Sequence, residues 1–274
     1  MKKNFPSHWM MIEHDFHVED DLLIPFALEE VITREVGQTG IPAVHMWTHP
    51  RGFVMGLRDR RLPGAVQAMS GLEQEGRKVI VRHSGGAAVP LHDGVLNVSF
   101  IHPKPTGSID FHHDFKVMVE FLAEACQRLG VRFEVGEIQG SYCPGDYDLA
   151  IGGRKFCGIA QRRQTKAYLV HAFIVVSGSG AELAERVRQF YAEASEGDDS
   201  LSYPRIVPAQ TASLNELTEG RIDTVDTLKE AIRQTVSAHA DRLTMHASYA
   251  SIEQPILEQT EQMMEQLRQR YEKR

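Results

Sequence analysis

The stretch GSYCPGDYDLAIGGRKFCGIAQRR, residues 140–163, decides the fold class. Residues 146–151 and 154–160 flank Gly152-Gly153, a composition typical of the two-residue turn of a β-hairpin. A doubly wound parallel sheet needs a regular alternation of strands and helices, and a hairpin in the middle of the chain breaks it. We therefore expect an α+β fold with a mostly antiparallel central sheet flanked by helices, which lie to one side of it.

The remaining elements are predicted from apolar spacing and from glycine and proline punctuation. Helices are expected over 23–36 (ending before Gly37), 64–75, 110–129, 180–194, 223–243 and 251–273. Strands are expected over 44–47 and 53–57, around the turn at 50–52, and over 78–82, 95–101, 132–138 and 168–176, with loops over 103–108 and 197–208. Residues 1–248 are expected to form a single domain, and 249–274 a C-terminal helix that packs on it or extends from it.

The composition excludes several classes of function. The chain has 274 residues, is 42% hydrophobic and carries a formal charge of −7, with no basic stripe for nucleic acid. Net negative charge disfavours an acidic membrane surface, and no segment has the roughly 18 apolar residues of a membrane span. The N-terminal residues lack the apolar core of a signal peptide, and three cysteines without framework spacing indicate free thiols. We expect a cytoplasmic protein.

The histidines and two of the three cysteines do not indicate a metal or reactive site. The chain has 13 histidines, but the clusters at 92–93 and 112–114 lack the spacing of a zinc site, so we expect no metal. Cys126 falls in the apolar stripe of the helix over 110–129 and is expected to be buried. Cys157 lies in a regular strand, where packing is favoured over a role as a second pocket thiol.

Cys143 and Lys155 form a candidate catalytic pair. Cys143 lies in a stiff loop before Pro144, and a free thiol with a pKa near 8.5 is mostly protonated at pH 7. A neighbouring ammonium favours the thiolate and lowers the pKa of a cysteine beside it. A two-residue turn places Ala150 opposite Lys155, near the start of the hairpin, where Cys143 could fold back over the lysine. An ordinary surface hairpin with an inert thiol is the alternative that the residues alone leave open.

The segment 82–100, RHSGGAAVPLHDGVLNVSF, offers a candidate ligand loop. Small residues after a buried strand allow a ligand to approach backbone N–H groups, although neither GxxxxGK[ST] nor GxGxxG is present. A plain tight turn is the alternative, and Asp93-Gly94 equally fits turn chemistry. The candidate substrate-binding residues of this segment are Arg82, Ser84, Gly85, Gly86, His92 and Asn97.

Three motifs, in this order, resemble the biotin/lipoate protein ligase and transferase superfamily. They are WTHP at 47–50 followed by VMG at 54–56, the segment 82–100, and GGRKFCGIAQRR at 152–163. The match covers about residues 20–245 and implies the biotin/lipoate ligase catalytic-domain fold for residues 1–248. It implies that Lys155 is the family's lysine, and that Gly158 and Ala160 bind substrate. Ala87 stands where a third glycine is common, which weakens the case for nucleotide phosphates at this loop.

The position of the cysteine separates the branches of the superfamily. Ligases activate lipoate with ATP and need no cysteine, whereas octanoyltransferases use a cysteine and a lysine. Here Cys143 precedes Lys155 by 12 residues. That order most closely resembles the branch that moves an octanoyl group from octanoylated glycine cleavage H protein to the lysine of lipoyl domains of 2-oxoacid dehydrogenase E2 subunits. The resemblance implies Cys143 as the acyl-thioester nucleophile, Lys155 as the group that lowers its pKa and donates a proton, and no cofactor.

The resemblance also implies an apolar tunnel for the acyl chain and oxyanion donors at 84–86 or 158–160. Arg154, Arg162 and Arg163 are candidate docking charges for acidic lipoyl domains, although a solvated face is equally consistent with them. Three alternatives remain: octanoyl transfer from acyl carrier protein to H protein, an ATP-dependent lipoate ligase, and an inactive lipoyl-domain binding protein. The presence of both Cys143 and Lys155 argues against the last.

Overall fold

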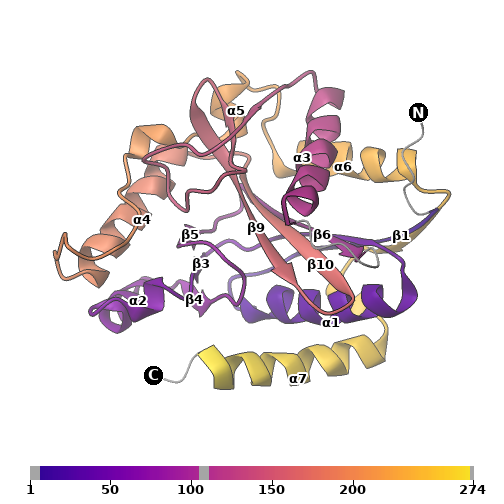
Figure 1. Ribbon diagram of the computed structural model, residues 1–274, viewed down its shortest axis with the longest axis horizontal. Helices are drawn as coiled ribbons and strands as arrows, with labels where there is room; N and C mark the ends of the chain where they lie inside the picture. The colour runs from indigo at the N-terminus through magenta and orange to yellow at the C-terminus, as the bar shows by residue number, and fades with distance from the viewer. Residues whose placement is uncertain (1–6, 105–110, 272–274) are drawn as a thin grey trace.

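A computed structural model describes residues 7–104 and 111–271, and shows two sheets and the helices around them (Figure 1). The large sheet has the strand order β11-β1-β2-β6-β10-β9-β8-β7, and the small sheet has the order β4-β3-β5. The strands are β1 (His8–Asp15), β2 (Ala43–Thr48), β3 (Gly52–Met55), β4 (Lys78–Val81), β5 (Val89–Pro90), β6 (Val95–Pro103), β7 (Glu134–Val135), β8 (Leu149–Ile151), β9 (Arg154–Arg163), β10 (Ala167–Val175) and β11 (Arg242–His246). The α-helices are α1 (Leu23–Thr39), α2 (Ala65–Gln74), α3 (Phe111–Arg128), α4 (Gly180–Ala194), α5 (Leu214–Leu217), α6 (Val225–His239) and α7 (Gln254–Tyr271). Short 3-10 turns cover Asp59–Arg61, Pro208–Gln210 and Tyr249–Ser251.

The predicted hairpin joins β8 to β9. Gly152 and Gly153 have φ values of 57° and 72°, as a two-residue turn with both central residues at positive φ requires. Ala150 pairs with Lys155 across the hairpin, as expected. From β2 through β6, β10, β9 and β8 to β7 every neighbouring pair is antiparallel, so the predicted mostly antiparallel sheet is confirmed.

Helices cover both faces of the large sheet, so the expectation that they lie to one side was wrong. Figure 1 shows α3 and α6 on one face and α1 with α7 on the other. The reason lies in the central strands β6 and β10, whose residues are buried almost without exception. A strand that is apolar on both sides needs cover on both sides.

The edge of the sheet beyond β2 was not predicted. β1 pairs with β2 and with β11, and both pairings are parallel. The helix expected over 223–243 ends at His239, and Arg242 and Leu243 belong to β11. The pairing of β1 with β11 joins the start of the described chain to a strand that precedes α7, and no local pattern signals it.

Two predicted boundaries also differ from the structure. α1 continues past Gly37 and ends at Thr39, where Gly40 caps it with a φ of 72°. A Cβ on Gly37 would lie 2.9 Å from the Cβ of Lys166, so this glycine allows a close approach of the β9–β10 turn. The strand expected over 132–138 is reduced to β7. Part of the loop expected over 103–108, and the helix start at Asp110, lie outside the described residues.

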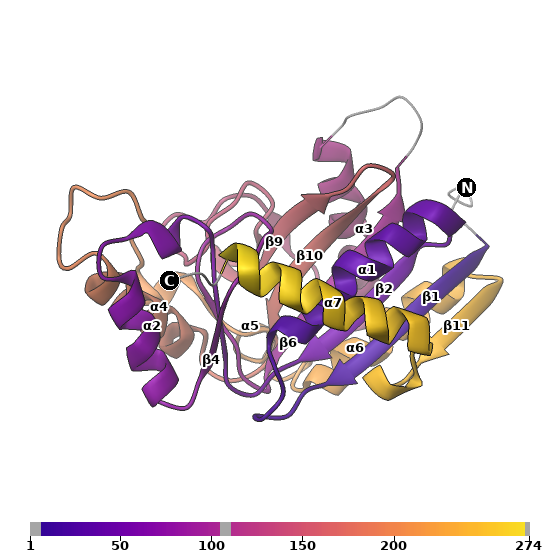
Figure 2. The same cartoon turned by 90° about the horizontal axis from the view of Figure 1, so that it is seen from below.

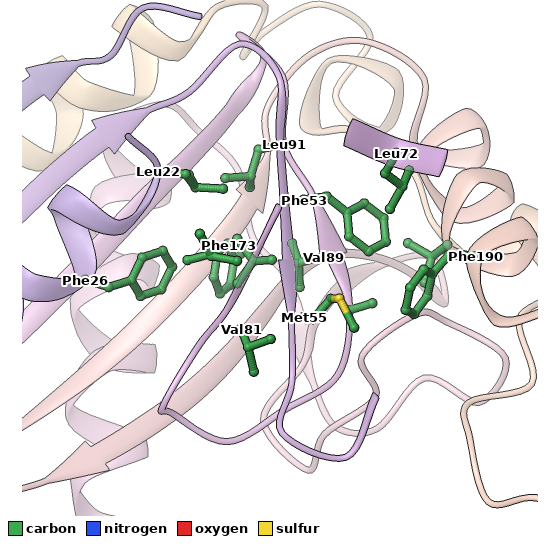
Figure 3. Packing of buried hydrophobic residues seen from close by; sticks show 14 of the residues in the cluster. Leu22, Phe26, Phe53, Met55, Leu72, Val81, Val89, Leu91, Phe173 and Phe190 are labelled. Carbon is green, nitrogen blue, oxygen red and sulfur yellow. The ribbon is translucent and has the colours of Figure 1, made fainter. Parts of the chain in front are cut away.

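The small sheet forms a second layer that carries the glycine loop. The chain leaves the large sheet at the turn after β2 and continues as β3. This strand pairs with β4 and β5, and the small sheet packs against α2 and α4. Figure 3 shows Phe53, Leu72 and Phe190 in this layer, with Phe173 of β10 and Val89 on the side of the large sheet. The residues between β4 and β5 are therefore held above β9 and β10.

The C-terminal helix α7 runs along α1, as Figure 2 shows. Its Met263 and Leu267 are buried in the same core cluster as Phe26 of α1. No helix within residues 7–104 and 111–271 is long and apolar enough to cross a membrane.

Candidate active site

The loop between β7 and β8 presents Cys143 in a strained conformation. Cys143 has a φ of 47°, in the left-handed region that residues with a side chain rarely adopt. Its neighbours Ser141 and Tyr142 are buried and hold the loop, while Cys143 is half-buried. Backbone strain of this kind persists only where the surroundings impose it, and it is concentrated at functional sites.

The sulfur of Cys143 contacts the glycine loop. Nη2 of Arg82 donates to Sγ at 3.3 Å, and the backbone N–H of Ala87 donates to it at 3.1 Å. Gly86 has a φ of 101°, and a Cβ there would lie 2.2 Å from Nη2 of Arg82 and 3.0 Å from Sγ. The structure thus brings Arg82 and Gly86, both predicted site residues, directly to the cysteine.

Lys155 holds the backbone of the cysteine loop. Its Nζ donates to the carbonyl oxygens of Tyr142 at 2.9 Å and Cys143 at 2.6 Å, and pairs with Oδ1 of Asp148 at 2.9 Å. Among the described residues, the hydrogen-bond donors to Sγ are Arg82 and Ala87, and Lys155 is not one of them. The lysine is therefore next to Cys143, but its contacts are with the main chain and a carboxylate.

Asp148 is a site residue that the sequence analysis missed. It is 1% exposed, accepts from the N–H of Gly145, and forms the ion pair with Lys155. Burial raises the pKa of Asp148 to about 6, although the ammonium of Lys155 opposes the shift. The available signal was an acidic residue between the cysteine and the lysine, but Asp146 carried the same signal.

An apolar cavity opens beside Cys143. Its volume is about 10 Å³, the space of about one water molecule and far below the roughly 300–1,000 Å³ of small-ligand sites. The apolar lining includes Val89, Phe156, Ile159 and Phe173, and Arg82, Cys143, Lys155 and Thr211 are at its polar end. The apolar lining suits an alkyl chain whose reactive end lies at the cysteine, and such a chain requires the lining side chains to move apart.

A second, wider basin lies across the glycine loop from the apolar cavity. It has a volume of about 620 Å³ and includes His83, Ser84, Gly85 and Tyr203 in its lining. Gly86, Ala87 and Pro144 line it as well, next to the contacts of the cysteine sulfur. Cys143 thus lines the apolar cavity, and its sulfur accepts from Ala87, which lines the basin.

Two predicted residues of β9 line the apolar cavity. Gly158 and Ala160 are among its lining residues. A Cβ on Gly158 would lie 3.2 Å from Nζ of Lys155, so the absence of a side chain leaves room for the ammonium.

His92 and Asn97 do not line either cavity. Nδ1 of His92 accepts from the N–H of Gly94 in a local turn. Asn97 is fully buried in β6, where its Nδ2 donates to the carbonyl of Trp47, and it pairs in register with Phe173. Asn97 therefore lies one strand away from the cavity, and binding roles for the two residues stay predictions.

The other thiols are buried, as expected. Burial raises the pKa of Cys126 to about 12 and the pKa of Cys157 well above its usual value. Cys157 packs in the core but also lines the apolar cavity, so both interpretations of it apply. In the described part of the chain, no group of three His, Cys, Asp or Glu residues is arranged to hold a metal ion.

The predicted docking arginines at the end of β9 are partly neutralised. Arg162 pairs with Glu30 at 2.9 Å and Arg163 with Asp114 at 3.3 Å. Both border a groove of about 470 Å³ beside the turn between β9 and β10. A docking role for them stays a prediction.

The comparison with known proteins defines the class. The family described as the lipoyl protein ligase A/B catalytic domain matches residues 21–237, and the chain belongs to this family. The predicted resemblance, the predicted α+β fold and the predicted enzyme class, an acyltransferase, are confirmed.

Its relatives narrow the class further. The chain is 40% identical over 220 residues to the octanoyl-[GcvH]:protein N-octanoyltransferase of Geobacillus kaustophilus, covering 80% of this chain and 77% of that one. It is 37% identical over 238 residues to the enzyme of the same name from Anoxybacillus flavithermus, covering 86% of each.

Solved structures agree on the fold. Lipoate-protein ligase A bound with ATP superposes with a TM-score of 0.72 at 17% identity, covering 94% of both chains. A lipoate protein ligase from T. acidophilum with bound lipoic acid gives 0.69 at 18% identity, covering 96% of this chain and 95% of that one.

Proposed function

We propose that this protein moves an octanoyl group from the lysine of octanoylated glycine cleavage H protein to the lysine of lipoyl domains of E2 subunits, through a thioester on Cys143. The names of the relatives support the donor. The observation that carries the proposal is a strained cysteine at the polar end of an apolar cavity, with two N–H donors on its sulfur. A ligase that activates a free acid with ATP has no use for such a cysteine.

In the first step, the thiolate of Cys143 attacks the carbonyl carbon of the octanoyl amide, so that a carbon–sulfur bond forms and the carbon–nitrogen bond breaks. The departing lysine amine needs a proton, and Lys155 is the nearby ammonium that supplies it. Thioester formation from an amide is uphill, and the buried lysine lowers the barrier by protonating the leaving group.

In the second step, the amine of the acceptor lysine attacks the thioester, and the thiolate of Cys143 leaves. The attacking nitrogen gives a proton to Lys155, which restores the ammonium. The sum exchanges one amide for another, so no ATP is consumed. The apolar cavity holds the alkyl chain through both steps, and the two lysines enter from the basin lined by the glycine loop.

Substrate contacts follow from the same placement. We assign Ser84, Gly85 and Gly86, with Gly158 and Ala160, to the binding of the acyl group near the sulfur. Backbone N–H groups of the glycine loop are candidates to stabilise the oxyanion, because they face the sulfur at Ala87.

The test is the mass of the intact protein after incubation with octanoylated H protein in the absence of ATP. An octanoyl adduct of about 126 Da is expected on the wild type and on Cys126→Ala, and not on Cys143→Ser. Cys126 is the matched control, because it is a buried thiol in α3 away from the cavity. An unmodified wild type, or transfer that survives Cys143→Ser, would overturn the proposal.

Two further arms separate the alternatives. Octanoyl-acyl carrier protein as the donor tests transfer from the carrier to H protein. Free octanoate or lipoate with ATP tests a ligase, which would modify the acceptor domain without an adduct on Cys143. Adduct formation from H protein in preference to both supports the proposed donor.

A further inference from the structure

Arg82 is a buried cation at the centre of the site. It follows β4, its side chain is 1% exposed, and it lines the apolar cavity. Nη2 donates to the carbonyl of Ala87 at 2.8 Å and to Sγ of Cys143 at 3.3 Å, and the guanidinium lies 5.0 Å from the ring of Phe173. Its Nε and Nη1 are buried without a hydrogen-bond partner among the described residues.

No carboxylate in the described part of the chain forms an ion pair with Arg82. The carboxylate of Asp59 interacts electrostatically with Arg82. Its hydrogen bonds, however, come from the hydroxyl of Tyr191 and the N–H of Gly56. Burial raises the pKa of Asp59, which weakens it as a counterion. A buried charge without a counterion is unfavourable. The guanidinium therefore favours the anionic form of a titratable group that it contacts.

The charge of Lys155, in contrast, is already compensated. Its ammonium pairs with Asp148 and donates to two main-chain carbonyls. Lys155, the second buried cation of the site, therefore already has a counterion in Asp148. Of the two groups in the described part of the chain that accept from Arg82, the sulfur of Cys143 is the one that can become an anion.

We propose that Arg82, rather than Lys155, is the catalytic cation that stabilises the thiolate of Cys143, with the N–H of Ala87 as the second donor to the sulfur. This inference rests on the proposed function for its purpose, because the thiolate is the attacking group and the leaving group of the two steps. Lys155 is then free to act on the amine nitrogens, and it holds the cysteine loop in place.

The other titratable groups around the sulfur do not compete for this role. Burial raises the pKa of Tyr142 and of Tyr191 far above neutrality, so both stay neutral. On the side of the glycine loop, His83 bonds to Glu30 at 2.9 Å. Arg82 thus remains the charged donor in contact with Sγ among the described residues.

The experiment measures the rate of alkylation of Cys143 by iodoacetamide as a function of pH, with the modified peptide identified by mass. Removal of the cation in Arg82→Gln should raise the pH midpoint by roughly one to two units and lower the rate at pH 7 about tenfold or more. Lys155→Gln/Asp148→Asn, which removes both charges of the buried pair, should shift the midpoint less than Arg82→Gln does. Arg58→Gln is the control for charge, because Arg58 is an exposed arginine that lines the same basin.

A wild-type midpoint in Arg82→Gln, or a larger shift in Lys155→Gln/Asp148→Asn than in Arg82→Gln, would overturn the inference. Circular dichroism establishes that each variant is folded. If Arg82→Gln does not fold, Arg82→Lys replaces it, and a midpoint between the wild type and the pH dependence of a free thiol is expected, because a shorter cation remains.

Alkylation needs no acyl substrate, so it separates this inference from the proposed function. A midpoint shift in Arg82→Gln together with no octanoyl adduct on Cys143 would leave Arg82 as the thiolate's cation and reject the transfer reaction. An adduct with no midpoint shift would do the reverse.

Discussion

Lys155→Met removes an ammonium with three buried acceptors and keeps most of the apolar stem. The ammonium bonds the carbonyls of Tyr142 and Cys143 and pairs with Asp148 at 2.9 Å, and both partners of the pair are at most 3% exposed. Breaking a buried pair from one side costs about 3–5 kcal/mol, since the remaining charge is left alone. With roughly 2–4 °C of Tm per kcal/mol for a chain of this size, we expect Tm at pH 8 to fall by about 6–20 °C.

The loss should depend on pH through Asp148. Burial raises the pKa of Asp148 to about 6 even with the ammonium beside it, so in Lys155→Met the carboxyl should hold its proton to a still higher pH. A group with a raised folded pKa contributes stability at low pH that is lost as the pH rises through that pKa. The deficit relative to the wild type should therefore be small at pH 5, where Asp148 is protonated in both proteins, and large at pH 8.

Thermal unfolding followed by circular dichroism at the two pH values tests this. Lys155→Met/Asp148→Asn should recover part of the loss at pH 8, because no buried charge is left unpaired. Lys116→Met, at an exposed position of α3, should leave Tm within about 2 °C of the wild type. Equal deficits at pH 5 and pH 8, or a double variant that loses the sum of the two single effects, would refute the reasoning.

Three further outcomes are expected. Gly86→Ala should lower the rates of alkylation and acylation of Cys143 at least tenfold, because a Cβ there would collide with the guanidinium of Arg82. Gly85→Ala should not lower them, because no atom lies within 4 Å of its Cβ. Equal effects in the two variants would contradict this prediction. Glu29→Gln should lower Tm and make Tm less dependent on pH in the acid range. Burial alone would raise the pKa of Glu29, but two buried histidines lower it, so the carboxylate contributes stability that is lost as the pH falls. An unchanged decline of Tm in acid would count against this prediction. Ala160→Phe should fill the apolar cavity and favour acyl chains shorter than octanoyl in competition assays, and unchanged chain-length preference would contradict the assignment of the cavity.

The fold was predictable where its determinants are local. Gly152-Gly153 requires a turn with positive φ at both positions, and that turn alone sets the register that places Ala150 opposite Lys155. The apolar stripe containing Cys126 predicted its burial in the same way. In each case the residues that decide the outcome lie within a few positions of one another.

The sheet edge and the layers were not predictable from such patterns. The parallel pairing of β1 with β11 joins residues more than two hundred positions apart, and only the assembled sheet brings them together. That helices cover both faces follows from the central position of β6 and β10, which is a property of the strand order.

The sequence by itself determined the class of the protein and the candidate pair of Cys143 and Lys155. It also determined the turn at Gly152-Gly153, which sets the position of Lys155 in the hairpin. The tertiary structure decided what each of them touches. Arg82 donates to the sulfur of Cys143 although 61 residues of sequence separate them, and Asp148 forms an ion pair with Lys155. Turn geometry is encoded by neighbouring residues, whereas the pairing of buried charges depends on how distant segments pack, and that packing assigns Arg82 to the sulfur and Lys155 to the main chain.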